Sequence, residues 1–507
     1  MKSYLKHLSF FYVLSGIIIV FSGCSKAKSS LQTSNTISFM IIDNNGKALT
    51  GSDSGKVLSY MKEWTGVDVA FQFVESDKYN DKVSETLKSS RLPMIMHINN
   101  MNQEIVEAAH NGKLWDLNQF IWDEKKYPNL SKANKNVCRS LEVNGNLIGI
   151  YKARDIGRNG LSYRTDWAEK LGLGVPETPE DIYNMMYAFT YGDPDGNGID
   201  DTTGLAMCSY TGPFDVIQTW FGAGNAWVEQ KGSIIPIHQT AEYKDALDWL
   251  RRIYEEGLMS ADWTNRDTKS WQNQVRKGYA GVYIDVMDGG RRIWDGFVND
   301  HVQSVVDPLK NASMTLVGAI NEKTLATAGY NGFLIVTKGA ETKEQAELCL
   351  HYLDKMCDDE MIILGSYGLK DVHYRIEGGF IVSDKNADAH SYSALNQATA
   401  YIPHSLNMAR PAVKQNERKL KEIEVIAENE KYAVFNPALA YLSNSPTYAE
   451  KGAVLDKILS EARTKYICGE INEEGLQTAF DQWNRQGGTA VLAEVNAQYR
   501  TEATSGR

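Results

Sequence analysis

The sequence predicts an α/β fold built from two lobes or more. Segments of strand character alternate with helical segments along much of the chain, the order that places helices against a sheet. The chain has 507 residues, of which 43% are hydrophobic and 10% aromatic, so it carries enough apolar material for large cores. Because single cores stop growing at about 250–300 residues, this length favours more than one lobe.

Hydrophobic period and turn residues predict the first elements in order. Residues 37–43 form a strand that ends at the turn Asn44-Asn45-Gly46, residues 67–74 alternate as a second strand, and residues 92–98 form a mainly apolar run. Helices are predicted between these strands, with glycine as the stop signal of the first and last. They cover residues 56–64, 81–90 and 102–110.

Later helices carry clear start signals and buried stripes. Thr178-Pro179-Glu180-Asp181 has proline at the first helical position and an acid three residues after the cap. Ile182, Met185, Met186 and Phe189 then follow at helical spacing, which predicts one buried face. Near the C-terminus the same spacing predicts helices that bury Ala453, Ile458, Leu459, Ala462 and Tyr466, and then Phe480 with Trp483.

The N-terminus has the pattern of a lipoprotein signal. Lys2, Lys6 and His7 precede an apolar run from Leu8 to Phe21, which is too short to span a bilayer comfortably. The run stops at Ser22-Gly23-Cys24, which resembles a lipobox, so we expect residues 1–23 to be a signal peptide and Cys24 to carry lipid. Residues 24–36 are small and polar and predict a tether. The alternative is an uncleaved N-terminal anchor.

Composition excludes several classes of protein. The net charge is −11 and no cluster of Lys or Arg occurs, so a nucleic-acid partner is not expected. Five cysteines follow Cys24, without a Cys-x-x-Cys pair, and Cys349 and Cys357 are too far apart on one predicted helix for a disulfide. The sequence therefore predicts no disulfide framework and no cysteine metal site.

Residues 193–201 form the sharpest chemical motif in the chain. Asp193, Asp195, Asn197 and Asp201 fall at loop positions 1, 3, 5 and 9 of an EF-hand, and the Ile199 carbonyl falls at position 7. The twelfth position is Gly204 rather than glutamate, so the final ligand has to come from elsewhere. We expect one structural Ca²⁺ here. The alternative is an Asx-rich surface turn without metal.

Several segments together resemble the extracellular solute-binding lipoproteins of carbohydrate ABC transporters. The resemblance rests on the lipobox, on the block from Leu161 to Leu173, on the 193–201 loop, and on landmarks at residues 64–69, 112–117, 145–150 and 365–374, in family order. Size and calcium loop are most similar to the family-1-type binders of alginate or pectin oligosaccharides. The segment Gly368-Leu369-Lys370 departs from the family's usual glycine-isoleucine-glutamate.

The resemblance implies a type II periplasmic-binding-protein fold, with two lobes, a hinge and an interlobe ligand cleft. By similarity, the N-terminal lobe would comprise residues 37–154 and 327–386, and the C-terminal lobe residues 155–326 and 387–507. The implied function is capture of an oligosaccharide, including one that contains uronic acid, and its delivery to permease subunits. We expect a monomer that is lipid-anchored outside the cytoplasmic membrane of a bacterium.

Candidate ligand contacts are aromatic residues beside glycine-marked, irregular segments, because sugars need flat apolar faces and fixed polar groups. A single aromatic residue is more often core packing. Arg154 and Arg158 suit a carboxylate, although each also suits an ion pair. The candidates for substrate binding are Tyr151, Arg154, Trp220, Trp227, Tyr283, Asp285 and Tyr330.

The rival interpretation is a secreted, polysaccharide-active glycoside hydrolase. Paired acids can be chosen anywhere among 64 Asp and Glu residues, so their presence does not favour an enzyme. No His-Glu-x-x-His occurs, and Gly51-Ser52-Asp53-Ser54-Gly55 has Asp where a nucleophile elbow needs Ser. We therefore expect a binding protein without catalytic residues.

Overall fold

The computed structural model describes residues 35–403 and 413–505. Cys24, the expected signal peptide and nearly all of the expected tether lie outside these residues. Within them, no helix combines the length and apolar character needed to cross a membrane. The thiols of Cys138, Cys208, Cys349, Cys357 and Cys468 are all free.

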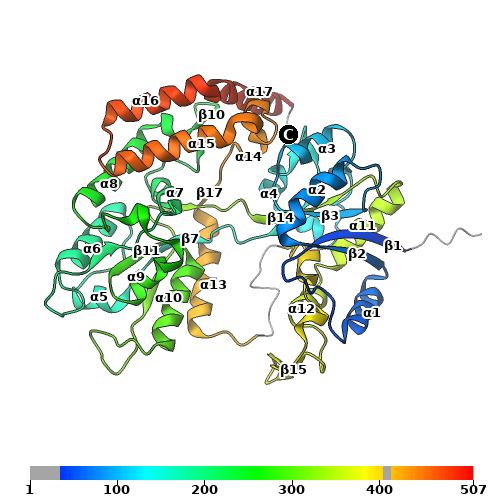
Figure 1. Ribbon diagram of the computed structural model, residues 1–507, viewed down its shortest axis with the longest axis horizontal. Helices are drawn as coiled ribbons and strands as arrows, with labels where there is room; N and C mark the ends of the chain where they lie inside the picture. The colour runs from blue at the N-terminus through cyan, green and yellow to red at the C-terminus, as the bar shows by residue number, and fades with distance from the viewer. Residues whose placement is uncertain (1–34, 404–412, 506–507) are drawn as a thin grey trace, which may run out of the picture. The chain divides into compact units, whose positions relative to one another are not determined.

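The first sheet has the strand order β2-β1-β3-β14-β6 in the described residues (Figure 1). The first three strands are parallel, whereas β14 lies antiparallel to both of its neighbours. Helices supply the apolar side chains that cover it, as the alternating pattern predicts. The strands are β1 (Thr36–Asp43), β2 (Asp68–Glu75), β3 (Ile95–Ile98), β14 (Tyr330–Val336) and β6 (Ile150–Ala153), and the helices are α1 (Ser54–Thr65), α2 (Tyr79–Lys88), α3 (Gln103–His110), α4 (Lys135–Arg139), α11 (Lys343–Lys355) and α12 (Asp359–Tyr367).

The second sheet has the order β12-β7-β11-β8 in the described residues. Strand β7 carries the Tyr163 and Arg164 of the family block and pairs antiparallel with both β11 and β12. The strands are β12 (Met314–Val317), β7 (Asn159–Arg164), β11 (Ala280–Val286) and β8 (Thr203–Leu205), and the helices around them are α5 (Thr165–Lys170), α6 (Pro179–Tyr191), α7 (Gly212–Trp220), α8 (Ala241–Glu255), α9 (Trp271–Arg276), α10 (Met287–Asn299) and α13 (Glu417–Asn429).

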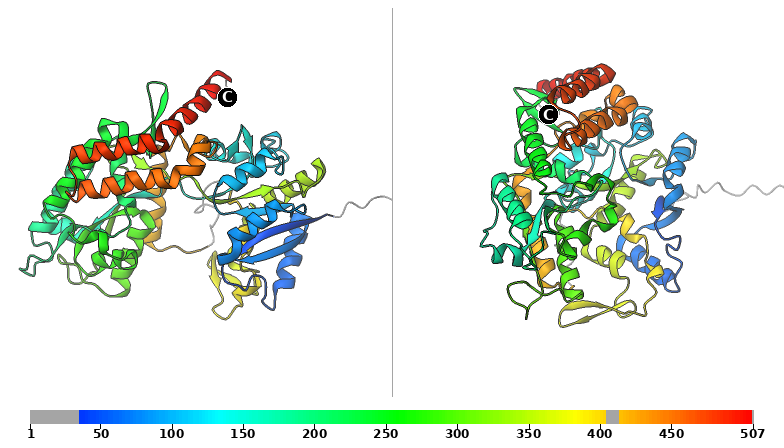
Figure 2. Two further views of the ribbon diagram at one scale, coloured as in Figure 1. Left: turned by 45° about the horizontal axis from the view of Figure 1, so that its top comes forward. Right: turned by 60° about the vertical axis from the view of Figure 1, so that its left-hand side comes forward.

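A group of C-terminal helices packs on the second-sheet side of the chain through α8 and a two-stranded ribbon. Figures 1 and 2 show α15 and α16 side by side, in agreement with their extensive contact. The elements are α14 (Leu439–Leu442), α15 (Pro446–Ile467), α16 (Glu473–Trp483), α17 (Thr489–Ser505) and the ribbon β9 (Trp227–Gln230) with β10 (Ser233–Pro236). Short strand pairs complete the fold, namely β4 (Glu142–Val143) with β5 (Asn146–Leu147), β13 (Thr324–Leu325) with β17 (Ala433–Val434), and β15 (Tyr374–Glu377) with β16 (Phe380–Ser383).

Most predicted local elements are confirmed. Helix α1 ends at Gly66, whose φ of 70° is the left-handed conformation that favours glycine. Helix α6 starts with the capping box of Thr178 and Asp181, and its Ile182, Met185, Met186 and Phe189 are buried. The apolar run at 92–98 is a strand only from Ile95. The predicted α/β class is therefore correct, and the described residues form two main sheets together with short two-stranded pairs.

Candidate ligand-binding site

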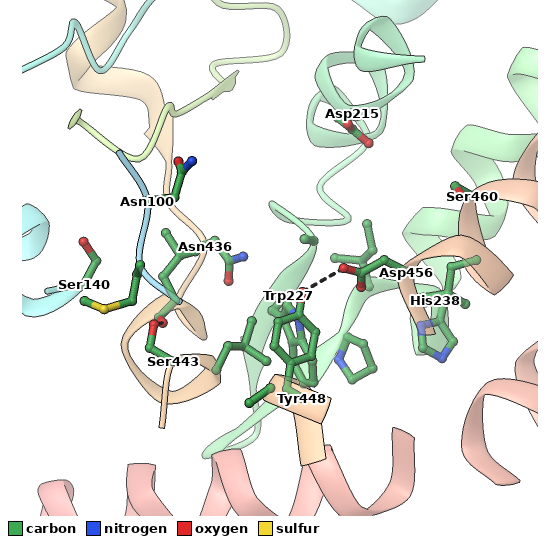
Figure 3. A pocket seen from close by; sticks show the side chains of 18 of the residues that line it. Asn100, Ser140, Asp215, Trp227, His238, Asn436, Ser443, Tyr448, Asp456 and Ser460 are labelled. Atoms are coloured by element: carbon green, nitrogen blue, oxygen red, sulfur yellow. Dashed lines mark hydrogen bonds between the residues drawn. The ribbon is translucent and has the colours of Figure 1, made fainter. Parts of the chain in front are cut away.

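A cavity of about 700 Å³ is the main candidate for ligand binding. Side chains from three parts of the chain line it: residues near the first sheet, the β9–β10 ribbon with its neighbours, and the C-terminal helices (Figure 3). We call it the aromatic cavity, because its lining includes Trp227, Tyr243, Tyr330, Tyr448 and Trp483. Flat apolar faces combined with a few polar groups are the pattern of small-molecule sites.

Trp227 reaches the cavity from a glycine-containing turn. Gly222, Gly224 and Ala226 all have positive φ, so the chain reverses tightly before β9. A Cβ on Gly224 would lie 2.9 Å from the Trp227 carbonyl oxygen, which only glycine avoids. The Trp227 side chain is 6% exposed, so most of the ring is packing and one part of it borders the cavity.

Tyr448 and Trp483 form the wall that the C-terminal helices contribute. Tyr448 lies in the first turn of α15, where its ring packs against Gly452, and its hydroxyl donates a 2.8 Å hydrogen bond to the Asp456 carboxylate (Figure 3). Trp483 packs against the ring of His238 with centroids 4.6 Å apart. A Cβ on Gly488 would lie 2.0 Å from the indole ring, so glycine at this position allows the chain to pack closely against Trp483.

Polar groups lie among the rings. Arg463 donates to Asp215 over 2.5 Å and to the Thr211 hydroxyl over 3.1 Å, while its Nε has no hydrogen-bond partner in the described residues. Neither ring nitrogen of the buried His238 has one either. Burial lowers the pKa of His238 to about 4, which leaves the imidazole neutral near pH 7. These three nitrogen atoms are themselves buried, so the cavity combines apolar faces with polar side chains such as Asp456 and Asn436.

The structure brings some of the expected contacts to cavities and buries others. Trp227 and Tyr330 line the aromatic cavity, whereas Arg154 and Asp285 line a smaller hollow of about 430 Å³ that shares Asp215 with it. Burial raises the pKa of Asp285. The remaining candidates, Tyr151, Trp220 and Tyr283, are fully enclosed in the hydrophobic cores.

Packing explains the positions of these three enclosed rings. The Tyr151 hydroxyl accepts a hydrogen bond from the Asn134 amide, and Tyr283 packs against Trp271 at 4.7 Å. A Cβ on Gly289 would lie 2.4 Å from the Tyr283 hydroxyl, so the nearby glycine serves helix packing rather than ligand access. We do not retain Tyr151, Trp220 or Tyr283 as ligand contacts.

The loop at 193–201 forms a chain of Asx turns between α6 and β8. The carboxylate of Asp193 accepts hydrogen bonds from the backbone amides of Gly196 and Gly198. Asp195 accepts one from the backbone amide of Asn197, and the side-chain oxygen of Asn197 accepts one from the backbone amide of Ile199. The side-chain amide of Asn197 lies between the carboxylates of Asp195 and Asp201, at 2.9 and 3.4 Å. Thr202 is engaged elsewhere, donating to the Phe189 carbonyl.

The donor set of this loop fits a hard cation. Asp193, Asp195, Asn197, Ile199 and Asp201 offer only oxygen atoms, the ligand type that Ca²⁺ selects. Partial burial, together with the adjacent carboxylates of Asp193 and Asp201, raises the pKa of Asp195, so a cation would relieve repulsion there. In the described part of the chain, however, no three His, Cys, Asp or Glu side chains converge as a metal-binding group.

Comparison with known proteins places the chain in a family. Lipoprotein LipO of Bacillus subtilis (strain 168) is 32% identical over 497 residues, covering 95% of this chain and 96% of LipO. The chain belongs to the extracellular solute-binding lipoproteins of carbohydrate ABC transporters. The polygalacturonan/rhamnogalacturonan-binding protein YtcQ of the same organism is a further relative, 28% identical over 465 residues and 88% of each chain. No family model matches the chain.

Solved structures of solute-binding proteins share the fold. An extracellular solute-binding protein from Bifidobacterium longum subsp. infantis aligns with a TM-score of 0.65 at 16% identity, over 92% of this chain and 98% of that one. An EF-hand mutant of the Streptococcus pneumoniae substrate-binding protein FusA, in complex with fructo-nystose, gives 0.60 at 18%, over 93% and 100%. The alginate-binding protein AlgQ2 without calcium ion gives 0.60 at 15%, over 92% and 98%. These solved structures share their fold with this chain and therefore confirm the two-lobed α/β fold that the sequence predicts.

Proposed function

We propose that this protein captures an oligosaccharide in the aromatic cavity and delivers it, unchanged, to the permease of an ABC importer. The observation that carries the proposal is the convergence of five aromatic side chains from distant segments on one cavity of about 700 Å³. The C–H faces of sugar rings pack on such side chains, and their hydroxyls need polar groups like Asp456 and Asn436, which also line the cavity. Relatives support the ligand class, since YtcQ is named for binding pectic polysaccharides.

A thermal-shift screen tests this proposal. Oligogalacturonides, rhamnogalacturonan fragments and fructo-oligosaccharides would be added to the purified protein, and the best ligand measured by calorimetry. A ligand that binds only the folded state at 100 times its Kd adds about 2.7 kcal/mol of stability. Chromatography of the same mixture should return the sugar intact, because no conversion is proposed. Steady formation of shorter products would overturn the proposal in favour of a glycoside hydrolase.

We also propose that Cys24 carries the lipid anchor and that residues 1–23 are removed. The apolar run ends at Ser22-Gly23-Cys24, and the relative LipO is named a lipoprotein. Two or more acyl chains hold a protein firmly at a bilayer, so the binding lobes would sample the medium outside the cytoplasmic membrane. Cys24→Ser should release or misprocess the protein. Membrane association equal to that of the parent, through an uncleaved helix, would contradict the lipid anchor.

A structural Ca²⁺ in the 193–201 loop is a further part of the proposed function. Support comes from the oxygen-only donor set and from two structural neighbours, the FusA EF-hand mutant and the alginate-binding protein AlgQ2 without calcium ion. Bound Ca²⁺ would neutralise the adjacent carboxylates of Asp193, Asp195 and Asp201 and hold the connection from α6 to β8. It would act on stability and not on the ligand, because none of these residues lines the aromatic cavity.

The lobe boundaries remain a proposal. Between residues 154 and 155 the chain passes from β6 to β7, and between 326 and 327 it returns toward β14. Leu395, Ala398, Ala400 and Ile402 belong to the first core, which supports extending the N-terminal lobe from residue 386 to about residue 402. The C-terminal lobe would then resume at α13. Hinge closure at these crossings would bring the two sides of the cavity onto the sugar.

A further inference from the structure

A second large cavity lies where the chain leaves β6, and its lining is charged rather than aromatic. It measures about 540 Å³, and we call it the basic cavity. It adjoins the hollow of Asp285 through Arg154 and Arg158, and that hollow adjoins the aromatic cavity through Asp215. Its ionisable lining consists of the basic side chains Lys152, Arg154, Arg158, Arg291 and Lys419 and the acidic side chains Asp155, Asp288 and Glu422.

Ion pairs engage two of the acidic groups in the lining. Asp288 lies 2.7 Å from Arg158 and also pairs with Arg292. Glu422 is buried and pairs with both Arg291 and Lys419. These two carboxylates are therefore held by other cations and do not compensate the charge of Lys152.

Lys152 stands out within this lining. It lies on β6, it is 7% exposed, and among the described residues its ammonium makes no ion pair with an acidic side chain. Its hydrogen-bond partner is the side-chain oxygen of Gln397, a neutral group that also lines the cavity. A buried cation without a counter-ion is costly, and burial accordingly lowers the pKa of Lys152 to about 7.

We propose that a carboxylate of the bound sugar supplies the missing counter-ion of Lys152, so that the ligand carries at least one uronic acid unit in the basic cavity. This inference rests on the proposed function. Arg154 borders the same space and suits a bidentate contact with a carboxylate. Asn331 and Gln397 offer amide groups to the remaining oxygens.

Charge also fixes which end of the ligand is acidic. In the aromatic cavity Asp215 is paired with Arg463, whereas the carboxylate of Asp456 makes no ion pair among the described residues and would repel a uronate there. A sugar that spans both cavities would therefore place a neutral or outward-facing unit against Trp227 and Tyr448, and its carboxylate against Lys152. A sugar that occupied both cavities would thus be recognised by the position of its charge as well as by the presence of charge.

Calorimetry with a matched pair of ligands tests this inference. The probes are the best-binding oligogalacturonide or rhamnogalacturonan fragment and the same fragment with its carboxylates reduced to primary alcohols. The acidic probe should bind the parent protein about 30-fold or more tightly than the reduced one, because a buried charge pair is broken by the reduction. Inorganic phosphate and free galacturonate, added as competitors, distinguish a general anion site from one that needs the sugar.

Variants of Lys152 locate the contact. Lys152→Met removes the charge at similar volume and should remove the preference for the acidic probe while leaving the reduced probe bound as before. Lys152→Arg should retain much of the preference, and Lys62→Met, at an exposed pair with Asp68, should change nothing. If Lys152→Met fails to fold, the comparison of the two probes on the parent still decides whether a carboxylate is recognised, and Lys152→Arg still reports on the Lys152 position.

Four outcomes distinguish failure of the proposed function from failure of the carboxylate site. Binding of no oligosaccharide at all, acidic or neutral, would overturn the proposed function itself. Equal affinity of the parent for the acidic and reduced probes would overturn the carboxylate site and leave the proposed function standing. An unchanged preference in Lys152→Met would remove Lys152 from the site. Competition by phosphate as strong as by galacturonate would show a general anion site and overturn the assignment to a sugar acid.

Discussion

Arg164 holds Asp166 through two parallel hydrogen bonds, Nε to Oδ1 at 2.9 Å and Nη2 to Oδ2 at 2.7 Å, and both side chains are buried. The guanidinium also lies between the rings of Trp167 and Phe297, at 4.8 and 4.9 Å. Asp166 accepts a further bond from the Val305 amide. Within the Leu161 to Leu173 block, which is part of the family resemblance, Arg164 and Asp166 therefore stabilise the fold around the second sheet, and neither lines the aromatic cavity.

Replacing Asp166 should destabilise the protein severely without changing its ligand. Asp166→Asn leaves Arg164 buried without a counter-charge, which typically costs about 3–5 kcal/mol. Asp68→Asn, at the exposed pair with Lys62, should cost less than about 1 kcal/mol. Urea denaturation measures both changes. A loss for Asp166→Asn as small as that of the control would contradict the structural role.

Trp227 should contribute to both stability and affinity, because most of its ring is packing and one part borders the aromatic cavity. Since Trp227 shares a cluster with Trp483, phenylalanine is the cleaner change. Trp227→Phe should weaken oligosaccharide binding by about 1–2 kcal/mol, or roughly 5- to 30-fold.

A buried tryptophan away from the cavity supplies the control for this change. Trp263 lies in the apolar core around the second sheet. Trp263→Phe should lower stability about as much as Trp227→Phe does and leave affinity unaltered. Calorimetry and thermal melting of both variants separate the two effects. If Trp227→Phe binds as tightly as the parent, the site does not lie in the aromatic cavity.

Removal of calcium should lower the melting temperature. Ca²⁺ bound in the 193–201 loop stabilises the folded state by mass action, so a chelator should destabilise the parent. Asp195→Asn should abolish that sensitivity and leave sugar affinity within a few-fold, whereas Asp81→Asn, on the exposed start of α2, should remain sensitive. A parent whose melting temperature ignores the chelator would favour the plain Asx-rich turn.

His238 should make the protein sensitive to mild acid. Its folded-state pKa of about 4 lies below the ordinary value of 6.5, so between these values the unfolded state binds the proton and the folded state does not. Stability contributed by the neutral ring is therefore complete above pH 6.5 and is lost as the pH falls toward 4, by up to about 3 kcal/mol. Burial likewise lowers the pKa of His97 to about 3, so this histidine on β3 makes a second contribution to stability that is lost in acid.

His238→Leu isolates the pH-dependent stability that His238 contributes. The imidazole has no hydrogen-bond partner in the described residues, so leucine leaves no polar group stranded. The variant should match the parent at pH 7.5 and lose less stability between pH 6.5 and pH 4.5, as measured by urea denaturation at each pH. Parallel pH dependence in the two proteins would show that His238 does not titrate in this window.

Local structure was largely predictable because its causes lie close together in the sequence. The capping box of Thr178 with Asp181, the stop at Gly66 and the stripe of α6 are each determined by residues within one or two turns. The Asx-turn pattern of the 193–201 loop is equally local. These features needed no knowledge of the rest of the chain.

The ligand-binding site was less predictable, because its residues come from separate segments. Tyr448 and Trp483 carry no local signal that distinguishes a cavity wall from a core, and only the fold brings them to Trp227 and Tyr330. Glycine beside an aromatic ring was an ambiguous marker. At Trp227 it marks a turn that borders the cavity, whereas Gly281, before Tyr283, marks close packing of β11 against Phe189 of α6.

The position of β14 has a consequence for the order of folding. This strand lies between β3 and β6, so the first sheet has a gap until residues 330–336 arrive, after all of residues 154–329 have been made. Contacts of such long sequence separation form slowly, since loop closure must precede the pairing. A nascent chain therefore cannot complete its N-terminal sheet early, and it stays open to translocation or to proteolysis for longer than a domain of contiguous sequence would.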